Sequence, residues 1–188
     1  MTSASDAMLK EPRVRQCVRT ATLKYMAPND SARPKEAMKN VLILGIGNIL
    51  QSDDGLGVHV VNEILSMDSA LPDCVEVIDG GTAGFDLIPL MRGRDRIIIV
   101  DALRTDDKPG SVYRLGPEHC RDGKARISLH EIGILQVLKT LRLLGDDPEI
   151  EIIGIVPEDI DTLAIGVTES VRRSLAIAAK TAIDAAVQ

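Results

Sequence analysis

The chain has 188 residues, of which 45% are hydrophobic and 27% are charged, and its formal net charge is −6 at pH 7. This length and composition predict one globular domain with a sizeable core, and the acidic balance argues against nucleic acid or an anionic membrane as the main partner. Because only 2% of the residues are aromatic and none is Trp, the core must be aliphatic, and stacking platforms for single-stranded nucleic acid are disfavoured.

The chain lacks the sequence signals of membrane insertion and export. No apolar run approaches the roughly 20 residues that a membrane-spanning helix needs, and no secretory signal peptide is evident. The three cysteines, Cys17, Cys74 and Cys120, are too far apart for a disulfide framework or a CxxC metal site. We therefore expect a cytoplasmic protein with reduced thiols.

The first segment differs in composition from the rest of the chain. Residues 1–39 carry more basic than acidic side chains, with scattered prolines and no helical or strand periodicity. We expect residues 1–38 to be a disordered leader or to precede the true start at Met38. A transit peptide fits less well because the segment is not poor in acids. The folded domain is predicted to span residues 39–188.

The segment 41–65 has the pattern of a buried strand, a glycine-containing turn and an amphipathic helix. Residues 41–44 form a short apolar run, typical of a strand covered on both faces. Gly45 and Gly47 permit backbone conformations that a side chain would obstruct. From residue 56 onward the apolar residues recur with helical spacing.

Two adjacent acids stand between this strand and this helix. Asp53 and Asp54 lie beyond the carboxyl end of a buried strand, where ligands and catalytic groups gather in α/β proteins. His59 falls on the polar face of the following helix, where we expect a surface residue.

The alternation of strand and helix continues along the chain. Apolar or alternating runs predict four further strands, at residues 74–78, 96–100, 111–115 (with the polar alternation of a sheet edge) and 149–156. Helical patterns occur at 85–92, after the capping box that begins at Ser128, and from Thr168 to near the C-terminus. This order predicts an α/β fold with a largely parallel sheet between helical layers.

Three polar side chains should then converge on one rim of the sheet. Asp54 and Asp101 each follow a strand, and His130 lies in the first turn of a helix. Two carboxylates and one imidazole suit a divalent ion and leave positions open for water or a substrate donor. Without a metal the same groups could perform acid–base chemistry. Each acid could instead cap a helix, the interpretation we favour for Asp53, and His130 could simply be solvated.

A nucleotide site is a weaker interpretation of the first turn. The Gly-Ile-Gly-Asn sequence begins like a dinucleotide fingerprint, but the third glycine of G-x-G-x-x-G would fall on Leu50. The acidic pair that follows would also repel a pyrophosphate.

Five motifs in unbroken order resemble those of the hydrogenase maturation proteases: GIGNILQSDDGLG, DGGTAGFDLI, IIIVDAL, SLHEIG and IIGIVPE. These endopeptidases remove a C-terminal extension from the large subunit of nickel–iron hydrogenases. The resemblance covers residue 39 to the C-terminus and does not cover residues 1–38. It implies a three-layer α/β/α sandwich around a twisted, mostly parallel five-stranded sheet, which agrees with the five strands counted above.

The resemblance also implies roles for particular residues. It places a metal-binding trio on Asp54, Asp101 and His130; the first acid is often Glu in relatives, and the shorter Asp could change the metal affinity. It associates the GGT-x-G loop with substrate binding, here by Gly80, Gly81, Thr82 and Gly84.

The resemblance implies that the nickel belongs to the substrate, and no tightly bound organic cofactor is expected. A nickel ion already inserted in the precursor would be sensed by the open trio, so the loaded precursor would bind better than the empty one. No Ser–His, Cys–His or H-E-x-x-H arrangement is evident. We hypothesise direct attack by water, with Asp54, Asp79 or Asp101 as the general base.

The expected function is therefore that of an endopeptidase acting, as a monomer, on the nickel–iron hydrogenase large-subunit precursor. The first alternative is a non-catalytic nickel-sensing maturation chaperone that uses the same trio. The second, less well supported, is a nucleotide-binding domain.

Overall fold

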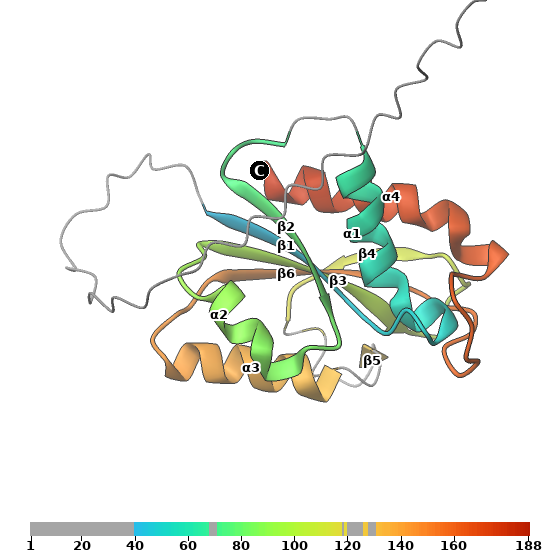
Figure 1. Ribbon diagram of the computed structural model, residues 1–188, viewed down its shortest axis with the longest axis horizontal. Helices are drawn as coiled ribbons and strands as arrows, with labels where there is room; N and C mark the ends of the chain where they lie inside the picture. The colour runs from blue at the N-terminus through green and yellow to red at the C-terminus, as the bar shows by residue number, and fades with distance from the viewer. Residues whose placement is uncertain (1–39, 68–70, 118, 120–125, 128–130) are drawn as a thin grey trace, which may run out of the picture. The chain divides into compact units, whose positions relative to one another are not determined.

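Parallel strands make up most of the sheet in the part of the chain that the structure describes. The computed structural model describes residues 40–67, 71–117, 119, 126–127 and 131–188, all within the unit Glu36–Gln188. The main path of the sheet has the order β2–β1–β3–β6–β4 (Figure 1). Its strands are β1 (Val41–Ile46), β2 (Val75–Gly81), β3 (Arg96–Arg104), β4 (Val112–Leu115) and β6 (Glu149–Ile155).

Strand direction agrees with the sequence prediction. β1 pairs in parallel with β2 and β3, and β3 pairs in parallel with β6. β4 lies at the edge of the sheet, as its polar alternation predicted, and it is antiparallel to β6, which was not predicted. The two-residue strand β5 (Arg126–Ile127), which was not predicted, pairs antiparallel with the end of β3.

Helices cover both faces of the sheet, which confirms the three-layer α/β/α sandwich (Figure 1). On one face lie α1 (Leu56–Ser66) and α4 (Glu169–Ala186), and on the other lie α2 (Ile88–Met91) and α3 (Glu131–Leu143). Two 3-10 turns, η1 (Ser52–Gly55) and η2 (Gly84–Leu87), lead into α1 and α2. No helix among the described residues is both long enough and apolar enough to span a bilayer.

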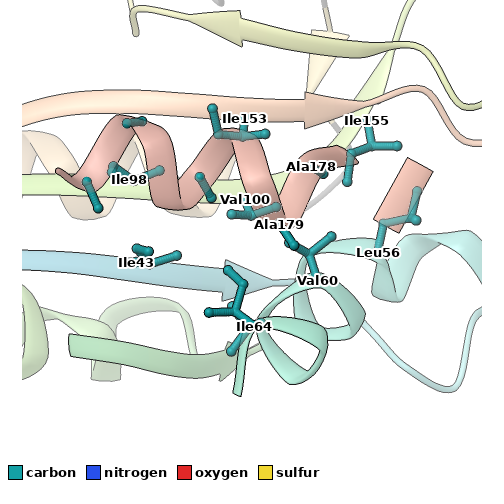
Figure 2. Close-up of a cluster of buried hydrophobic side chains, with 14 of the residues drawn as sticks. Ile43, Leu56, Val60, Ile64, Ile98, Val100, Ile153, Ile155, Ala178 and Ala179 are labelled. Carbon is teal, nitrogen blue, oxygen red and sulfur yellow. The ribbon is translucent and has the colours of Figure 1, made fainter. Parts of the chain in front are cut away.

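The strands divide their side chains between two aliphatic cores. In β1, Val41 and Ile43 pack on the α1/α4 side, whereas Leu42 and Leu44 pack on the α2/α3 side, as the period of two requires. Figure 2 shows the first core, where side chains of three neighbouring strands meet those of α1 and α4. No aromatic side chain is among the buried residues described, as the composition predicted.

α1 packs against the sheet with two glycines, Gly45 and Gly57, at the contact. A Cβ added at Gly45 would lie 2.3 Å from the carbonyl oxygen of Gly57. A Cβ added at Gly57 would lie 2.1 Å from the carbonyl oxygen of Val100. The two glycines therefore set how near η1 and α1 stand to the ends of β1 and β3.

The helix predictions were confirmed in position and corrected in detail. The helix expected at 85–92 begins as the 3-10 turn η2, and only four residues are α-helical, with Pro89 in the first turn. Thr168 is the N-cap residue of α4, but its hydroxyl makes no cap hydrogen bond because it donates to Asp53. The capping-box residue Ser128 lies outside the described residues, as do residues 1–39, Cys17 and Cys120. Cys74 is a free thiol.

Candidate active site

The carboxyl ends of the parallel strands bring several of the predicted residues to one rim of the sheet. Asp54 lies in η1, which follows β1, and Asp101 lies in the second half of β3. Both are buried, with exposed fractions of 4% and 0%. β1 and β3 are adjacent, so the structure brings the segments of these two acids together.

Asp101 faces the side of the sheet that α3 covers. Asp101 pairs in register with Gly154 of β6. The next residue of the strand, Ala102, has its side chain in the α1/α4 core, so the side chain of Asp101 points to the other face. Its neighbour Ile99, two residues before it, belongs to the α2/α3 core. Asp101 Oδ1 accepts a hydrogen bond from the N–H of Ala102 at 2.7 Å. The described part of α3, Glu131–Leu143, packs on this same side of the sheet.

Asp54 is held by the turn that follows β1. The N–H of Asn48 donates to Asp54 Oδ2 at 3.2 Å, and the Asn48 side-chain oxygen accepts from the N–H of Leu50 at 3.1 Å. Gly47 has φ +137°, and a Cβ there would lie 2.0 Å from the backbone oxygen of Asp54. A glycine is therefore required for this turn to close onto η1.

The third member of the predicted trio, His130, lies outside the described residues. Among the described residues, no three His, Cys, Asp or Glu side chains gather as ligands of a metal ion. The structure thus places Asp54 and Asp101, and the complete trio stays a prediction.

The side chain of Asp79 lies on the face of the sheet opposite to that of Asp101. It is exposed and alternates with Ile78, which packs against the α2/α3 core, so its side chain leaves β2 on the α1/α4 side. β2 and β3 are separated by β1, a distance of about 10 Å across two strand spacings. Asp79 Oδ1 accepts a hydrogen bond from the N–H of Gly81 at 2.9 Å. Asp79 therefore shapes the start of the GGT-x-G loop, and its role as a base stays a prediction.

The GGT-x-G loop borders a cavity of about 230 Å³. Three of the four predicted substrate-binding residues line it, together with apolar residues of β1, η2 and α3; the lining is Gly81, Thr82, Gly84, Ile46, Leu87, Gly133 and Ile134. The fourth, Gly80, is buried, and a Cβ there would lie 2.8 Å from Leu44 Cδ1. Gly80 thus packs against the core and the other three line the cavity, and the role of all four in substrate binding stays a prediction.

His59 is not the surface residue that the helical pattern predicted. Its side chain is half-buried, and its Nε2 is buried with no hydrogen-bond partner among the described residues. Burial lowers the pKa of His59; the negative charge of Asp53 opposes this shift and the positive charge of Arg172 on α4 reinforces it. The helical pattern of α1 alone could not reveal this, because α4 supplies the neighbouring charge.

Asp53 does not form the local helix cap that we expected, and its carboxylate bonds to the start of α4 instead. The N-cap residue of α1 is Gly55 and receives no side-chain hydrogen bond. Asp53 Oδ1 instead accepts the N–H of Thr168, the N-cap residue of α4, at 2.7 Å. The sequence contains no local signal for this contact, because 115 residues separate the two partners.

Comparison with known proteins identifies similar chains along most of this length. The family model "Hydrogenase maturation protease" matches residues 58–185. The hydrogenase 2 maturation protease of Escherichia coli K12 is 40% identical over 134 residues, which cover 70% of this chain and 80% of that protein. The hydrogenase expression/formation protein HoxM of Azotobacter vinelandii is 35% identical over 148 residues, which cover 77% of this chain and 71% of that protein.

Solved structures show the same fold. The hydrogenase maturating endopeptidase HybD from E. coli matches with a TM-score of 0.70 at 35% identity, over 78% of this chain and 91% of that one. The [NiFe] hydrogenase maturation protease HybD from Thermococcus kodakarensis matches with a TM-score of 0.68 at 31% identity, over 78% of this chain and 99% of that one.

Proposed function

We propose that this chain, which belongs to the hydrogenase maturation protease family and is an endopeptidase, removes the C-terminal extension of a nickel–iron hydrogenase large-subunit precursor after nickel insertion. The names of its relatives support a hydrogenase as substrate. That the substrate is the large subunit, and that the cut is made near its C-terminus, rests on the resemblance of the five motifs to those of the hydrogenase maturation proteases.

One structural observation carries the proposal: two carboxylates are buried on adjacent parallel strands, that of Asp54 in the turn after β1 and that of Asp101 in the second half of β3. The cavity bordered by Gly81, Thr82 and Gly84 opens at the same ends of the strands. Glycines expose backbone N–H and C=O groups to a bound chain, so an extended segment of the precursor would be held there by its own backbone. The scissile bond would then lie beside the two acids.

We assign the sensing of nickel to Asp54, Asp101 and His130. Two oxygen donors and one imidazole nitrogen suit a borderline divalent ion such as nickel. Three protein ligands leave coordination positions open for the donors of the precursor, which keeps its own nickel. Only the loaded precursor gains these bonds, so the difference in affinity acts as a checkpoint.

We assign peptide hydrolysis to direct attack by water, with one of three aspartates as the general base. Asp54 and Asp101 are buried and would act from the side of the peptide that faces the proposed nickel position. Asp79 is exposed and hydrogen-bonded to Gly81, so it would act from the loop side of the peptide. A base within about 3 Å of the water is required in each case. We expect no organic cofactor, and the free thiol of Cys74 is in keeping with a cytoplasmic location.

Incubation of the purified protein with precursor, followed by mass spectrometry, tests this proposal. Wild-type protein should shorten the nickel-loaded precursor and leave the nickel-free precursor intact. Asp101→Asn and His130→Ala should abolish cleavage, whereas Asp147→Asn, the same chemical change at an exposed acid after α3, should not. Maturation at the wild-type rate in either site variant would refute the trio, and stable binding without cleavage by the wild type would favour the chaperone alternative.

A further inference from the structure

We propose that Asp53 is a positioning residue of the protease site: its buried carboxylate binds residues 157–168 to η1 and thereby fixes the carboxylate of its neighbour Asp54. The inference rests on the proposed function, because it takes Asp54 to be part of the site. Asp53 itself would touch neither the nickel nor the peptide.

The carboxylate of Asp53 is fully buried and accepts four hydrogen bonds from one segment of the chain. Oδ1 accepts from the N–H of Thr168 at 2.7 Å. Oδ2 accepts from the N–H groups of Glu158 and Asp159 at 2.9 and 3.1 Å and from the Thr168 hydroxyl at 2.9 Å. Because the side chain is fully buried and already accepts four hydrogen bonds, it is not accessible to a substrate.

Backbone contacts join the same two segments. The N–H of Asp53 donates to the carbonyl oxygen of Asp159, and the N–H of Ser52 donates to that of Ala164, both at 2.9 Å. Gln51 and Ala164 form an isolated parallel bridge. Three consecutive residues of the turn are therefore fixed to the segment before α4.

The turn needs this support because its backbone is strained. Ser52 has φ +46°, and it is the only non-glycine residue in the described part of the chain with a positive φ. Such a conformation persists only where the surroundings fix it. The contacts of Asp53 immediately follow the strained residue and hold it in place.

The two adjacent acids face different partners, which separates their roles. Asp53 bonds to residues 158–168, whereas Asp54 Oδ2 accepts from Asn48 in the turn after β1. A metal ligand must be held within a fraction of an ångström to complete a coordination sphere. If the Asp53 contacts are lost, η1 can shift and carry Asp54 away from this position.

The variant Asp53→Asn tests the inference because it keeps the shape and changes the acceptors. Its single side-chain oxygen can occupy only one of the two oxygen positions, and its NH₂ group would then face N–H donors at the other. As a control we choose Ser174→Ala, which removes the 2.7 Å hydrogen bond from the buried Ser174 hydroxyl of the same helix α4 to the carbonyl oxygen of Gly110 and makes no change in η1.

The experiment measures cleavage of nickel-loaded precursor and the affinity for loaded and nickel-free precursor, at a temperature where circular dichroism shows each variant folded. We expect Asp53→Asn to lower kcat at least tenfold and to lower the affinity ratio, loaded over empty, by a similar factor. Ser174→Ala should change neither, since lost stability alone does not alter discrimination in a folded protein. A folded Asp53→Asn variant with wild-type kcat and ratio would overturn the inference.

A second pair of variants decides the question if Asp53→Asn does not fold. Thr168→Val removes one hydroxyl donor to Asp53 and should lower kcat several-fold, and Thr168→Ser, which keeps the hydroxyl, should restore it. Wild-type kcat in Thr168→Val would again overturn the inference. Asp54→Asn separates this result from the proposed function: if it keeps wild-type cleavage and discrimination, the site assignment itself is wrong, whatever the other variants do.

Discussion

The contact between α1 and the sheet predicts that Gly57→Ala is severely destabilising. A Cβ at Gly57 would lie 2.1 Å from the carbonyl oxygen of Val100, 2.3 Å from that of Ile46 and 2.7 Å from the Ile46 nitrogen. All three atoms are backbone, so no change of rotamer can relieve the overlap. The start of α1 must instead move away from both β1 and β3.

The cost can be bounded from this geometry. Overpacking a well-packed core typically costs about 1–3 kcal/mol and sometimes more, and overlap with two strands places Gly57→Ala at the upper end, about 3 kcal/mol. For a domain of this size that loss corresponds to a fall of roughly 6–12 °C in Tm. It is also a large fraction of the roughly 5–15 kcal/mol that stabilises a typical protein.

Urea denaturation of wild type and variants measures the loss directly. Gly133→Ala is the matched control, because a Cβ there meets no described atom within 4 Å and lies inside α3. Its free energy of unfolding should be equal to the wild-type value or higher by up to about 1 kcal/mol. If Gly57→Ala unfolds within about 0.5 kcal/mol of wild type, the tight contact between α1 and the sheet is not a requirement of the fold, and the reasoning fails.

Three further outcomes follow from the described contacts. Ala182→Leu adds bulk at a fully buried position of α4 and should lower the unfolding free energy by about 2 kcal/mol, measured with urea; a change near zero would contradict the close packing of α4. Burial alone would raise the pKa of Glu151, but hydrogen bonds from Arg114 and Arg96 outweigh it and hold this pKa below 4.5. The contribution of Glu151 to stability is therefore present above pH 4.5 and lost as the pH falls through the lowered pKa. Glu151→Gln should make the urea midpoint less dependent on pH between pH 6 and 3, and an unchanged pH dependence would contradict the assignment. Burial lowers the pKa of His59 below 6.5, so the folded protein should lose stability relative to the unfolded chain as the pH falls below this value. An NMR titration midpoint of His59 above 6.5 would contradict the lowered pKa.

The strands were predictable because their signal is local. The apolar runs at 41–44 and 96–100 mark β1 and β3 without reference to the rest of the chain, and the alternation of strand and helix then fixed the three layers. β5 was not predicted, because a strand of two residues has no detectable periodicity. The helix predicted at 85–92 is α-helical only in α2, because it begins as the 3-10 turn η2 at Gly84, which has φ +56°, and has Pro89 in the first turn of α2.

The candidate site was predictable only in part, because its supporting contacts are distant in sequence. The position of Asp101 follows from the strand that carries it. The partners of Asp53 lie 105 to 115 residues away, and no local pattern identifies them. The face taken by Asp79 depends on the strand register, which shifts after Gly45. Tertiary packing, and not periodicity, decides these features.

The central claim is that Asp54, Asp101 and His130 share one divalent ion. Anomalous diffraction at the nickel absorption edge, from crystals grown with Ni²⁺, tests it most directly. The account predicts one strong peak with ligand atoms of all three side chains on the order of 2.1 Å from it. A peak elsewhere, or three side chains that face separate surfaces, would contradict it.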